Sequence, residues 1–163
     1  MFRLYPEGQV QEMIHQIMYG AQTHAAYQLG RRFGTMLKSQ DRLKDLDLIG
    51  PIPLHLRKLR RRGFNQSDFL AQGLSEALQI PWSKNTIKRV RFTESQTAKN
   101  RMDRLKNMEN AFALVPNQNL QHKHIMLVDD VLTTGATVEA CATTLNQKDN
   151  LRISVVTLAI AAS

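Results

Sequence analysis

The chain has 163 residues, of which 42% are hydrophobic and 22% charged, so it is long enough for one compact domain and too apolar for a disordered chain. Its single cysteine, Cys141, excludes an intramolecular disulfide and a cysteine-cluster zinc site within this sequence. The formal net charge of +8 favours anionic partners, either phosphorylated metabolites or nucleic acid. No apolar run reaches the ~20 residues of a membrane helix and no signal peptide is evident, so we expect a cytoplasmic protein without membrane insertion.

The first half of the sequence predicts helices followed by a short strand. Apolar residues at helical spacing predict amphipathic helices over about 9–19 and 24–38. Residues 46–49 predict a strand that the following prolines end, and Asn65 is the expected N-cap of a helix that runs to about Gln79. Residues 86–90 predict a further, weaker strand.

The second half predicts a lid and then a strand, a helix and a strand. Residues 91–110 are polar and cationic, which is typical of a lid or functional loop. Residues 124–128 predict the clearest buried strand, residues 137–145 a helix, and residues 151–159 a last strand. Strands that alternate with helices predict an α/β fold with a parallel sheet.

A strongly basic segment lies between the first strand and the Asn65 helix. It places five cations in six residues, namely Arg57, Lys58, Arg60, Arg61 and Arg62. Such a run is either a solvated surface or a contact with pyrophosphate or a nucleic-acid backbone. We interpret it as an anion-binding patch, because it adjoins the predicted site. Trp82 and Phe92 also flank basic residues; stacking on a base is the alternative, but we favour packing as their role.

The segment from Ile125 to Thr137 carries the most specific chemical signal. A buried strand delivers Asp129 and Asp130 to its carboxyl end, and the small-residue loop T-T-G-A-T then leads into a helix. Gly135 lets the backbone approach a ligand, and the threonine hydroxyls and the helix N-terminus favour a phosphate. The carboxylates suit ribose hydroxyls, so the segment predicts a ribose 5-phosphate site. Neither a P-loop nor a dinucleotide-binding glycine motif is present.

The segment V-D-D-V-L-T-T-G-A-T resembles the signature of type I phosphoribosyltransferases, and the rest of the chain is similar to the ComF (competence protein) family. The ComF resemblance rests on P-I-P-L at 51–54, R-G-F-N-Q at 62–66, Leu70, Ala71, Thr93, Ser95, Gln96, Arg104, Asn107, Ala111 and Phe112. It implies a three-layer type I phosphoribosyltransferase fold with a central, mostly parallel sheet and a small amino-terminal helical hood. We expect one domain over 1–163, with the hood at 1–40, the core at 45–163, and no four-cysteine zinc ribbon.

The resemblance also implies a role for each matching residue. Asp129 and Asp130 would hold the ribose hydroxyls as the candidate catalytic residues, and Thr133, Thr134, Gly135, Ala136 and Thr137 would wrap the 5-phosphate. Pro53, Leu54, His55, Leu56 and Arg57 would form the pyrophosphate loop, and Gln96 and Arg104 would belong to a mobile loop that closes over the substrate. Mg²⁺ would be bound through oxygens of 5-phosphoribosyl-1-pyrophosphate (PRPP), with Asp129 and Asp130 as the candidate protein ligands.

The function that this resemblance implies is binding of PRPP, or a related phosphorylated ribose, with Mg²⁺ in DNA uptake during natural transformation. Single-stranded DNA and a DNA-uptake helicase are further candidate partners. The alternative is an active phosphoribosyltransferase that transfers the pentosyl group to an unknown acceptor, such as a nucleotide-salvage enzyme, without a DNA role. A transcriptional regulator is a third reading, and the oligomeric state is not predicted.

Overall fold

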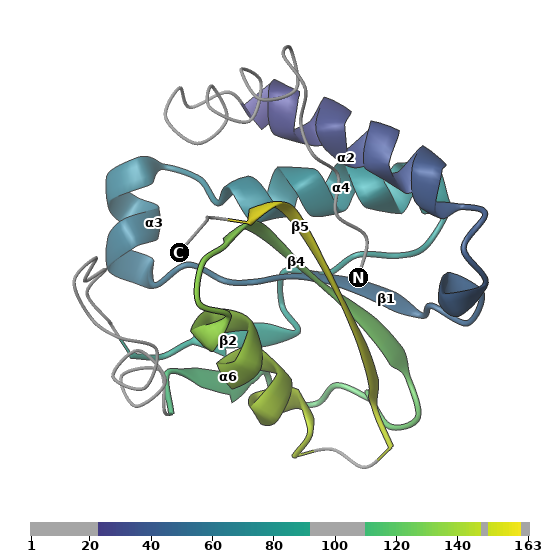
Figure 1. Cartoon of the computed structure of the whole chain (residues 1–163). Helices are drawn as coiled ribbons and strands as arrows, with labels where there is room; N and C mark the ends of the chain where they lie inside the picture. Colours follow the sequence, from purple (N-terminus) through teal and green to yellow (C-terminus); the bar gives the residue numbers. More distant parts are fainter. Residues whose placement is uncertain (1–22, 92–109, 148–149, 161–163) are drawn as a thin grey trace.

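A three-stranded parallel sheet forms the centre of the protein in the computed structural model, which describes residues 23–91, 110–147 and 150–160 (Figure 1). The strands are β1 (Leu48–Pro51), β4 (His124–Leu132) and β5 (Arg152–Ile160), and β4 lies between the other two. Ile49 pairs with Met126 on one side of β4, and Leu127 pairs with Val155 on the other. The expected parallel α/β sheet is confirmed.

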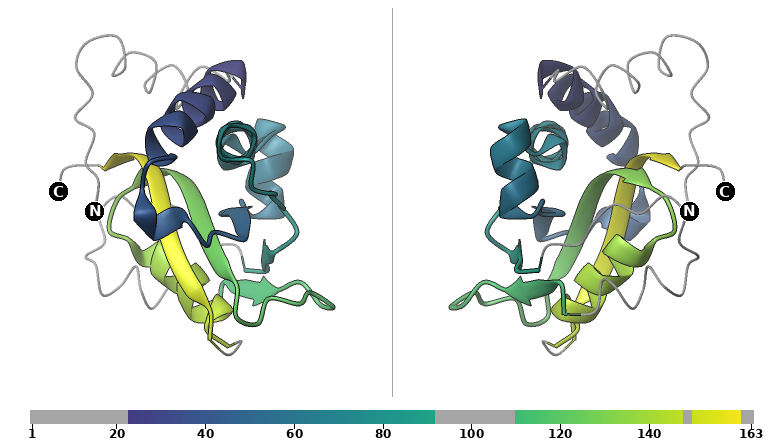
Figure 2. Two further views of the ribbon diagram at one scale, coloured as in Figure 1. Left: turned by 90° about the vertical axis from the view of Figure 1, so that its right-hand side faces the viewer. Right: turned by 90° about the vertical axis from the view of Figure 1, so that its left-hand side faces the viewer.

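Helices and a small two-stranded sheet cover the two faces of this sheet, as Figure 2 shows. The helices α2 (Thr23–Leu37) and α4 (Gln66–Leu78) form one outer layer. The other layer holds α6 (Ala136–Leu145) and the antiparallel pair β2 (Ile87–Arg89) and β3 (Phe112–Leu114). Two short helices, η1 (Asp41–Leu43) and α3 (Leu56–Arg62), lie in the connections on either side of β1.

Side chains of β4 that point alternately to the two faces of the sheet contribute to both hydrophobic cores. Met126 and Val128 belong to the core under α2 and α4, whereas Ile125 and Leu127 belong to the core under α6 and the β2–β3 pair. Successive side chains of a strand point to opposite faces, so an uninterrupted apolar strand fills two cores at once. The resulting three layers match the predicted fold class.

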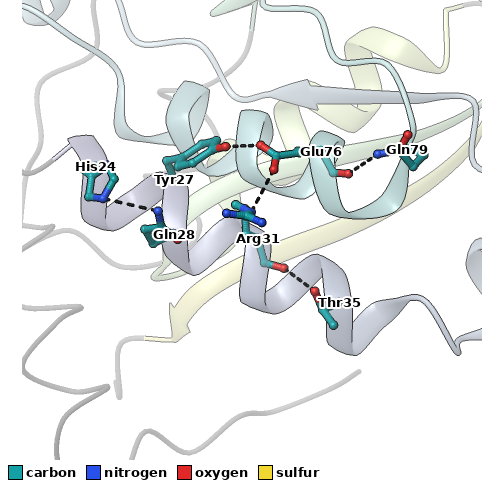
Figure 3. A network of polar contacts seen from close by, with 7 residues as sticks. All are labelled: His24, Tyr27, Gln28, Arg31, Thr35, Glu76 and Gln79. Atoms are coloured by element: carbon teal, nitrogen blue, oxygen red, sulfur yellow. Dashed lines mark hydrogen bonds and ion pairs between the residues drawn. The ribbon is translucent and has the colours of Figure 1, made fainter.

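The helices α2 and α4 approach each other so closely that only glycine fits at their crossing. A Cβ on Gly30 would lie 2.3 Å from the carbonyl oxygen of Leu70, and one on Gly73 would lie 2.1 Å from that of Tyr27. Polar contacts continue the interface, because Glu76 accepts a hydrogen bond from Tyr27 and pairs with Arg31 (Figure 3). The described part of the predicted hood, α2, is thus packed along a core helix; the division into hood and core stays a prediction.

Several predicted elements are confirmed, β3 and η1 were not predicted, and two differences concern the candidate site. The structure has the helices expected at 24–38, 65–79 and 137–145 and the strands at 46–49, 86–90 and 151–159, with ends shifted by one or two residues. The strand expected at 124–128 continues to Leu132, because its hydrogen-bonded pairing with β5 continues to Ile160. The helix expected at 9–19 and nearly all of the expected lid lie outside the described residues.

The second difference is α3, because the basic segment was not expected to be helical. His55 caps this helix, since its Nδ1 accepts a hydrogen bond from the backbone N–H of Arg57 at 3.1 Å. Gly63 ends it in the left-handed conformation with φ 84°, and the cations Arg60, Arg61 and Arg62 occupy the last turn, where the helix dipole favours them. None of the helices in the described part of the chain is long and apolar enough to cross a membrane.

Candidate functional site

The carboxyl ends of β1 and β4 bring the predicted ligand-binding segments to one edge of the sheet. Pro51 pairs with Val128, and the backbone N–H of Ile52 donates to the carbonyl of Val128 at 2.8 Å. The segment that follows β1 therefore runs beside the last residues of β4. This edge is where ligands bind in open α/β sheets, and it contains both the acid pair and the candidate pyrophosphate loop.

Asp129 is a half-buried carboxyl with an unusual charge state. Its Oδ1 accepts hydrogen bonds from the backbone N–H of Asp130 at 3.0 Å and from the hydroxyl of Ser67 at 3.5 Å. Burial and the neighbouring Asp130 carboxyl raise the pKa of Asp129 to about 7. The side chain is therefore protonated in a large fraction of molecules near neutral pH, and a ligand that donates hydrogen bonds would favour the ionised form.

Asp130 and Arg89 are further charged residues beside Asp129 at this edge. The Oδ1 of Asp130 accepts a hydrogen bond from the backbone N–H of Val131 at 2.8 Å. Burial lowers the pKa of Arg89, whereas the nearby Cys141 and Asp129 act to raise it. The Arg89 guanidinium also lies 5.3 Å from the centre of the Phe112 ring, which is a cation–π contact. A cation on β2 thus accompanies the acid pair on β4.

The segment after the acid pair has the form expected of a phosphate loop. β4 ends at Leu132, residues 133–135 turn, and Gly135 is the N-cap of α6 with φ 82°. A Cβ on Gly135 would meet nothing closer than 4.0 Å, so the positive φ, and not lack of space, requires glycine. No side chain caps this helix end, which leaves its first backbone N–H groups to bind an anion. Thr133 is exposed, Thr134 and Thr137 are half-buried, and Ala136 is buried.

The candidate pyrophosphate loop is shorter than predicted. Pro53, Leu54 and His55 form an irregular segment, but Leu56 and Arg57 already belong to the first turn of α3. His55 has a structural role as the cap of that helix. The high helix propensity of leucine, arginine and lysine explains why the helix begins directly after the cap.

The basic residues of α3 generate a positive field beside this loop. Arg57, Arg60, Arg61 and Arg62 are exposed, and Lys58 is half-buried. Burial lowers the pKa of Lys58 first, and the positive charges of Arg89, Arg61 and Arg62 lower it further. Mutual repulsion of this kind is relieved when an anion binds, which supports the interpretation of the segment as an anion-binding patch.

The structure adds two residues to the candidate site, and it does not describe two of the predicted ones. Ser67 donates a hydrogen bond to Asp129, and Arg89 interacts with Asp129 electrostatically, but nothing in the sequence around them distinguishes them from other polar residues. Gln96 and Arg104 lie outside the described residues. No group of three or more His, Cys, Asp and Glu side chains within the described ranges could hold a metal ion. Two carboxyls and a phosphate loop nevertheless fit Mg²⁺, which keeps few protein ligands and is bound mainly through substrate oxygens.

The chain is similar in sequence to curated proteins named for competence and DNA utilisation. The chain is 42% identical over 102 residues to competence protein F of Haemophilus influenzae, covering 62% of this chain and 44% of that protein. It is 39% identical over 134 residues to the DNA utilization protein YhgH of Salmonella typhimurium, covering 80% of this chain and 58% of that protein. It is 35% identical over 98 residues to competence protein ComFC of Bacillus subtilis, covering 60% and 38%. The chain thus spans about half the length of the curated relatives it matches, and no protein-family model matches it.

Solved structures identify the fold. An adenine phosphoribosyltransferase superposes with a TM-score of 0.56 at 12% identity, covering 88% of this chain and 72% of that one. The Saccharomyces cerevisiae adenine phosphoribosyltransferase gives a TM-score of 0.55 at 13% identity, covering 85% and 69%. The predicted resemblance in sequence and the predicted fold class are both confirmed.

Proposed function

We propose that this chain, a relative of the ComF-type competence proteins with the type I phosphoribosyltransferase fold, binds PRPP with Mg²⁺ and acts in DNA utilisation. The observation that carries the proposal is one edge of the sheet, where the acid pair Asp129–Asp130 leads directly into a helix N-terminus without a side-chain cap. The DNA role is supported by the names of the relatives, and the PRPP role by the chemistry of that edge.

Each part of PRPP has a chemically matched group in this arrangement. The backbone N–H groups at the start of α6 and the hydroxyls of Thr133, Thr134 and Thr137 would donate to the 5-phosphate. The carboxylates of Asp129 and Asp130 would accept from the two ribose hydroxyls. Residues 53–55 and the cations of α3 would neutralise the pyrophosphate, and Mg²⁺, when bound, would supply further positive charge there.

The charge state of Asp129 gives the proposal a specific signature. A ribose hydroxyl donates best to an ionised carboxylate, so binding would lower the pKa of Asp129 from about 7 and release a proton. Titration calorimetry near neutral pH, in two buffers of different ionisation enthalpy, would report that proton as a buffer-dependent heat. A phosphate bound only by α6 would release no proton from this carboxyl.

Titration of the protein with PRPP and Mg²⁺ tests the proposal directly. We expect Asp129→Asn and Asp130→Asn to weaken binding at least tenfold each, since each removes a charged hydrogen-bond acceptor. Asp41→Asn makes the same chemical change at an exposed residue that pairs with Lys44, and it should leave binding unaltered. Wild-type protein that binds no PRPP with or without Mg²⁺, or binding unaffected by both acid-pair variants, would refute the proposal.

Pentosyl transfer is the second candidate function, and the fold shared with adenine phosphoribosyltransferases favours it. An acceptor nitrogen would form a bond to ribose C1 as the bond from C1 to the pyrophosphate oxygen breaks, and pyrophosphate would leave with the electron pair. Release of pyrophosphate that depends on an added nucleobase would support transfer. PRPP binding without such release, for every nucleobase tried, would favour binding alone.

The DNA role has a separate test on α3. Arg60→Ala/Arg61→Ala/Arg62→Ala removes three exposed cations and should weaken salt-dependent binding of single-stranded DNA. Because this variant leaves the acid pair and the loop at 133–137 intact, its PRPP binding would show whether the two activities are separable. Unchanged DNA affinity would count against a role of α3 in DNA binding.

A further inference from the structure

A cleft with a volume of about 860 Å³ lies between α3, the first turns of α4 and β2. Pro53, Leu54 and His55 line the cleft, but Asp129, Asp130 and residues 133–137 do not. Its volume is typical of cavities that bind a small organic ligand. The cleft is therefore a second binding region, which shares residues 53–55 with the candidate pyrophosphate loop but none of the groups proposed to hold the ribose and its 5-phosphate.

Aromatic side chains form the apolar part of the wall. Phe64, Phe69 and Trp82 all line the cleft, and the rings of Phe64 and Phe69 meet edge to face with centres 6.2 Å apart. Phe69 and Trp82 also pack against the core under α2 and α4, whereas Phe64 belongs to neither of the cores formed by the described residues. Phe64 is half-buried, and the Arg62 guanidinium lies 5.9 Å from its ring centre. An aromatic residue outside the core, beside a cation, is suited to stacking on a flat ring.

A single acidic group lies among these aromatic residues. Asp68 lines the cleft and accepts a hydrogen bond from the side-chain amide of Asn65 at 2.8 Å. Burial raises the pKa of Asp68, although Asn65 and Lys84 both act to lower it. A carboxyl in this position can accept hydrogen bonds from the N–H groups on the edge of a nucleobase.

Cations lie along the open side of the cleft. Lys84 and Lys88 are exposed and line it, and the half-buried Arg89 lines it from β2. The nearby His55 has a lowered pKa, for which burial is the first cause and the positive charges of Arg89, Arg57 and Lys58 are the others. The cleft thus combines aromatic walls, one hydrogen-bond acceptor and a positive margin that continues onto α3.

We infer that this cleft binds one nucleotide of a single-stranded nucleic acid. The base lies against Phe64 and Trp82 with its N–H edge toward Asp68, and the phosphates contact Lys84 and Lys88. The exposed arginines of α3 then contact neighbouring phosphates of the same strand. The inference rests on the DNA part of the proposed function and is independent of the PRPP part. It adds the residues that recognise a base, whereas α3 by itself recognises only the backbone.

The chain's single tryptophan makes occupancy of the cleft directly measurable. Because Trp82 lines the cleft, a stacked base should quench its fluorescence. The probes are a short oligothymidylate, an abasic sugar–phosphate strand of the same length, and the mononucleotide dTMP. We expect quenching and tighter binding with the oligothymidylate, weak binding without quenching for the abasic strand, and weak binding of dTMP.

Two variants separate the base contact from the phosphate contacts. Phe64→Leu keeps an apolar side chain but removes the ring, and it should weaken oligothymidylate binding about tenfold while abasic-strand binding is unchanged. Lys84→Ala/Lys88→Ala should weaken both strands and reduce the slope of log affinity against log salt by about 1.4, or ~0.7 for each phosphate contact. Lys38→Ala, which changes an exposed lysine outside the cleft, is the control for charge. Circular dichroism and thermal melting show whether each variant is folded.

The possible failures are distinguishable. Equal affinity of the oligothymidylate and the abasic strand, or a Phe64→Leu variant that binds both like the wild type, would overturn the inference. Affinity for dTMP as tight as for the oligothymidylate would also overturn it, because the ligand would then be a free nucleotide. If the wild type binds none of the three probes, the DNA part of the proposed function fails as well. The PRPP titration tests the remaining part.

Discussion

Replacement of Asp129 by asparagine should stabilise the folded protein while it weakens ligand binding. The pKa of this carboxyl is raised from 3.8 to about 7, mainly by burial and then by Asp130. The ionised form is therefore disfavoured in the folded state. Asparagine has nearly the same shape, stays neutral, and can still accept the hydrogen bonds from Ser67 and from the backbone N–H of Asp130.

The size of the effect follows from the pKa shift. A shift of roughly three units at about 1.36 kcal/mol each gives an upper limit of ~4 kcal/mol for the cost of ionised Asp129. The attraction between Arg89 and ionised Asp129, which asparagine lacks, reduces this cost, and local relaxation reduces it further. We expect Asp129→Asn to raise the free energy of unfolding by about 2 kcal/mol above pH 8.

The pH dependence provides a sharper test than the size. Between pH 3.8 and about 7 the folded state binds more protons at Asp129 than the unfolded state does, so this group lowers stability as pH rises through that window. The stability difference between variant and wild type should be small at about pH 4.5, grow to about pH 7 and then level off. Urea unfolding at several pH values measures it. A variant less stable than the wild type at pH 8, or a difference independent of pH, would refute the reasoning.

Three further predictions concern glycine positions and a buried histidine. Gly73→Ala should lower the free energy of unfolding by about 2–3 kcal/mol, because its Cβ would meet the backbone of α2. Gly50→Ala, whose Cβ would meet no atom closer than 3.8 Å, should change that free energy by less than about 0.5 kcal/mol. Urea unfolding measures both, and equal effects would contradict the close crossing of the helices. Burial and then Arg152 lower the pKa of His124, so the folded state favours the neutral imidazole. The free energy of unfolding that this group contributes should therefore be lost as pH falls below 6.5. A His124 pKa above 6.5 in an NMR titration would contradict this. Gly135→Ala should lower the free energy of unfolding by about 1–2 kcal/mol, because φ of 82° is unfavourable for alanine, and it should weaken PRPP binding. A variant as stable as the wild type would show that alanine tolerates this backbone conformation.

The parts of the candidate site whose arrangement the sequence predicted are those encoded in one continuous segment. The strand, the acid pair and the loop before α6 follow one another between Ile125 and Thr137, so periodicity and residue type were sufficient. Ser67 reaches Asp129 from 62 positions away, and a single sequence carries no signal for such a contact. Helix α3 was missed because the run of cations was interpreted from its charge alone, as an anion-binding patch, although its residues have high helix propensity and His55 and Gly63 cap its ends.

Arg89 connects the proposed PRPP site with the nucleotide cleft. It interacts electrostatically with Asp129, and it also lines the cleft. If PRPP ionises Asp129, the guanidinium is held more strongly toward the acid pair, and less positive charge is directed at a strand in the cleft. We therefore expect saturating PRPP to weaken oligothymidylate binding a few-fold, and by linkage the oligothymidylate must weaken PRPP binding by the same factor. Arg89→Lys keeps the charge but shortens its reach, so it should reduce this coupling, whereas identical affinities with and without PRPP would show that the two sites are independent.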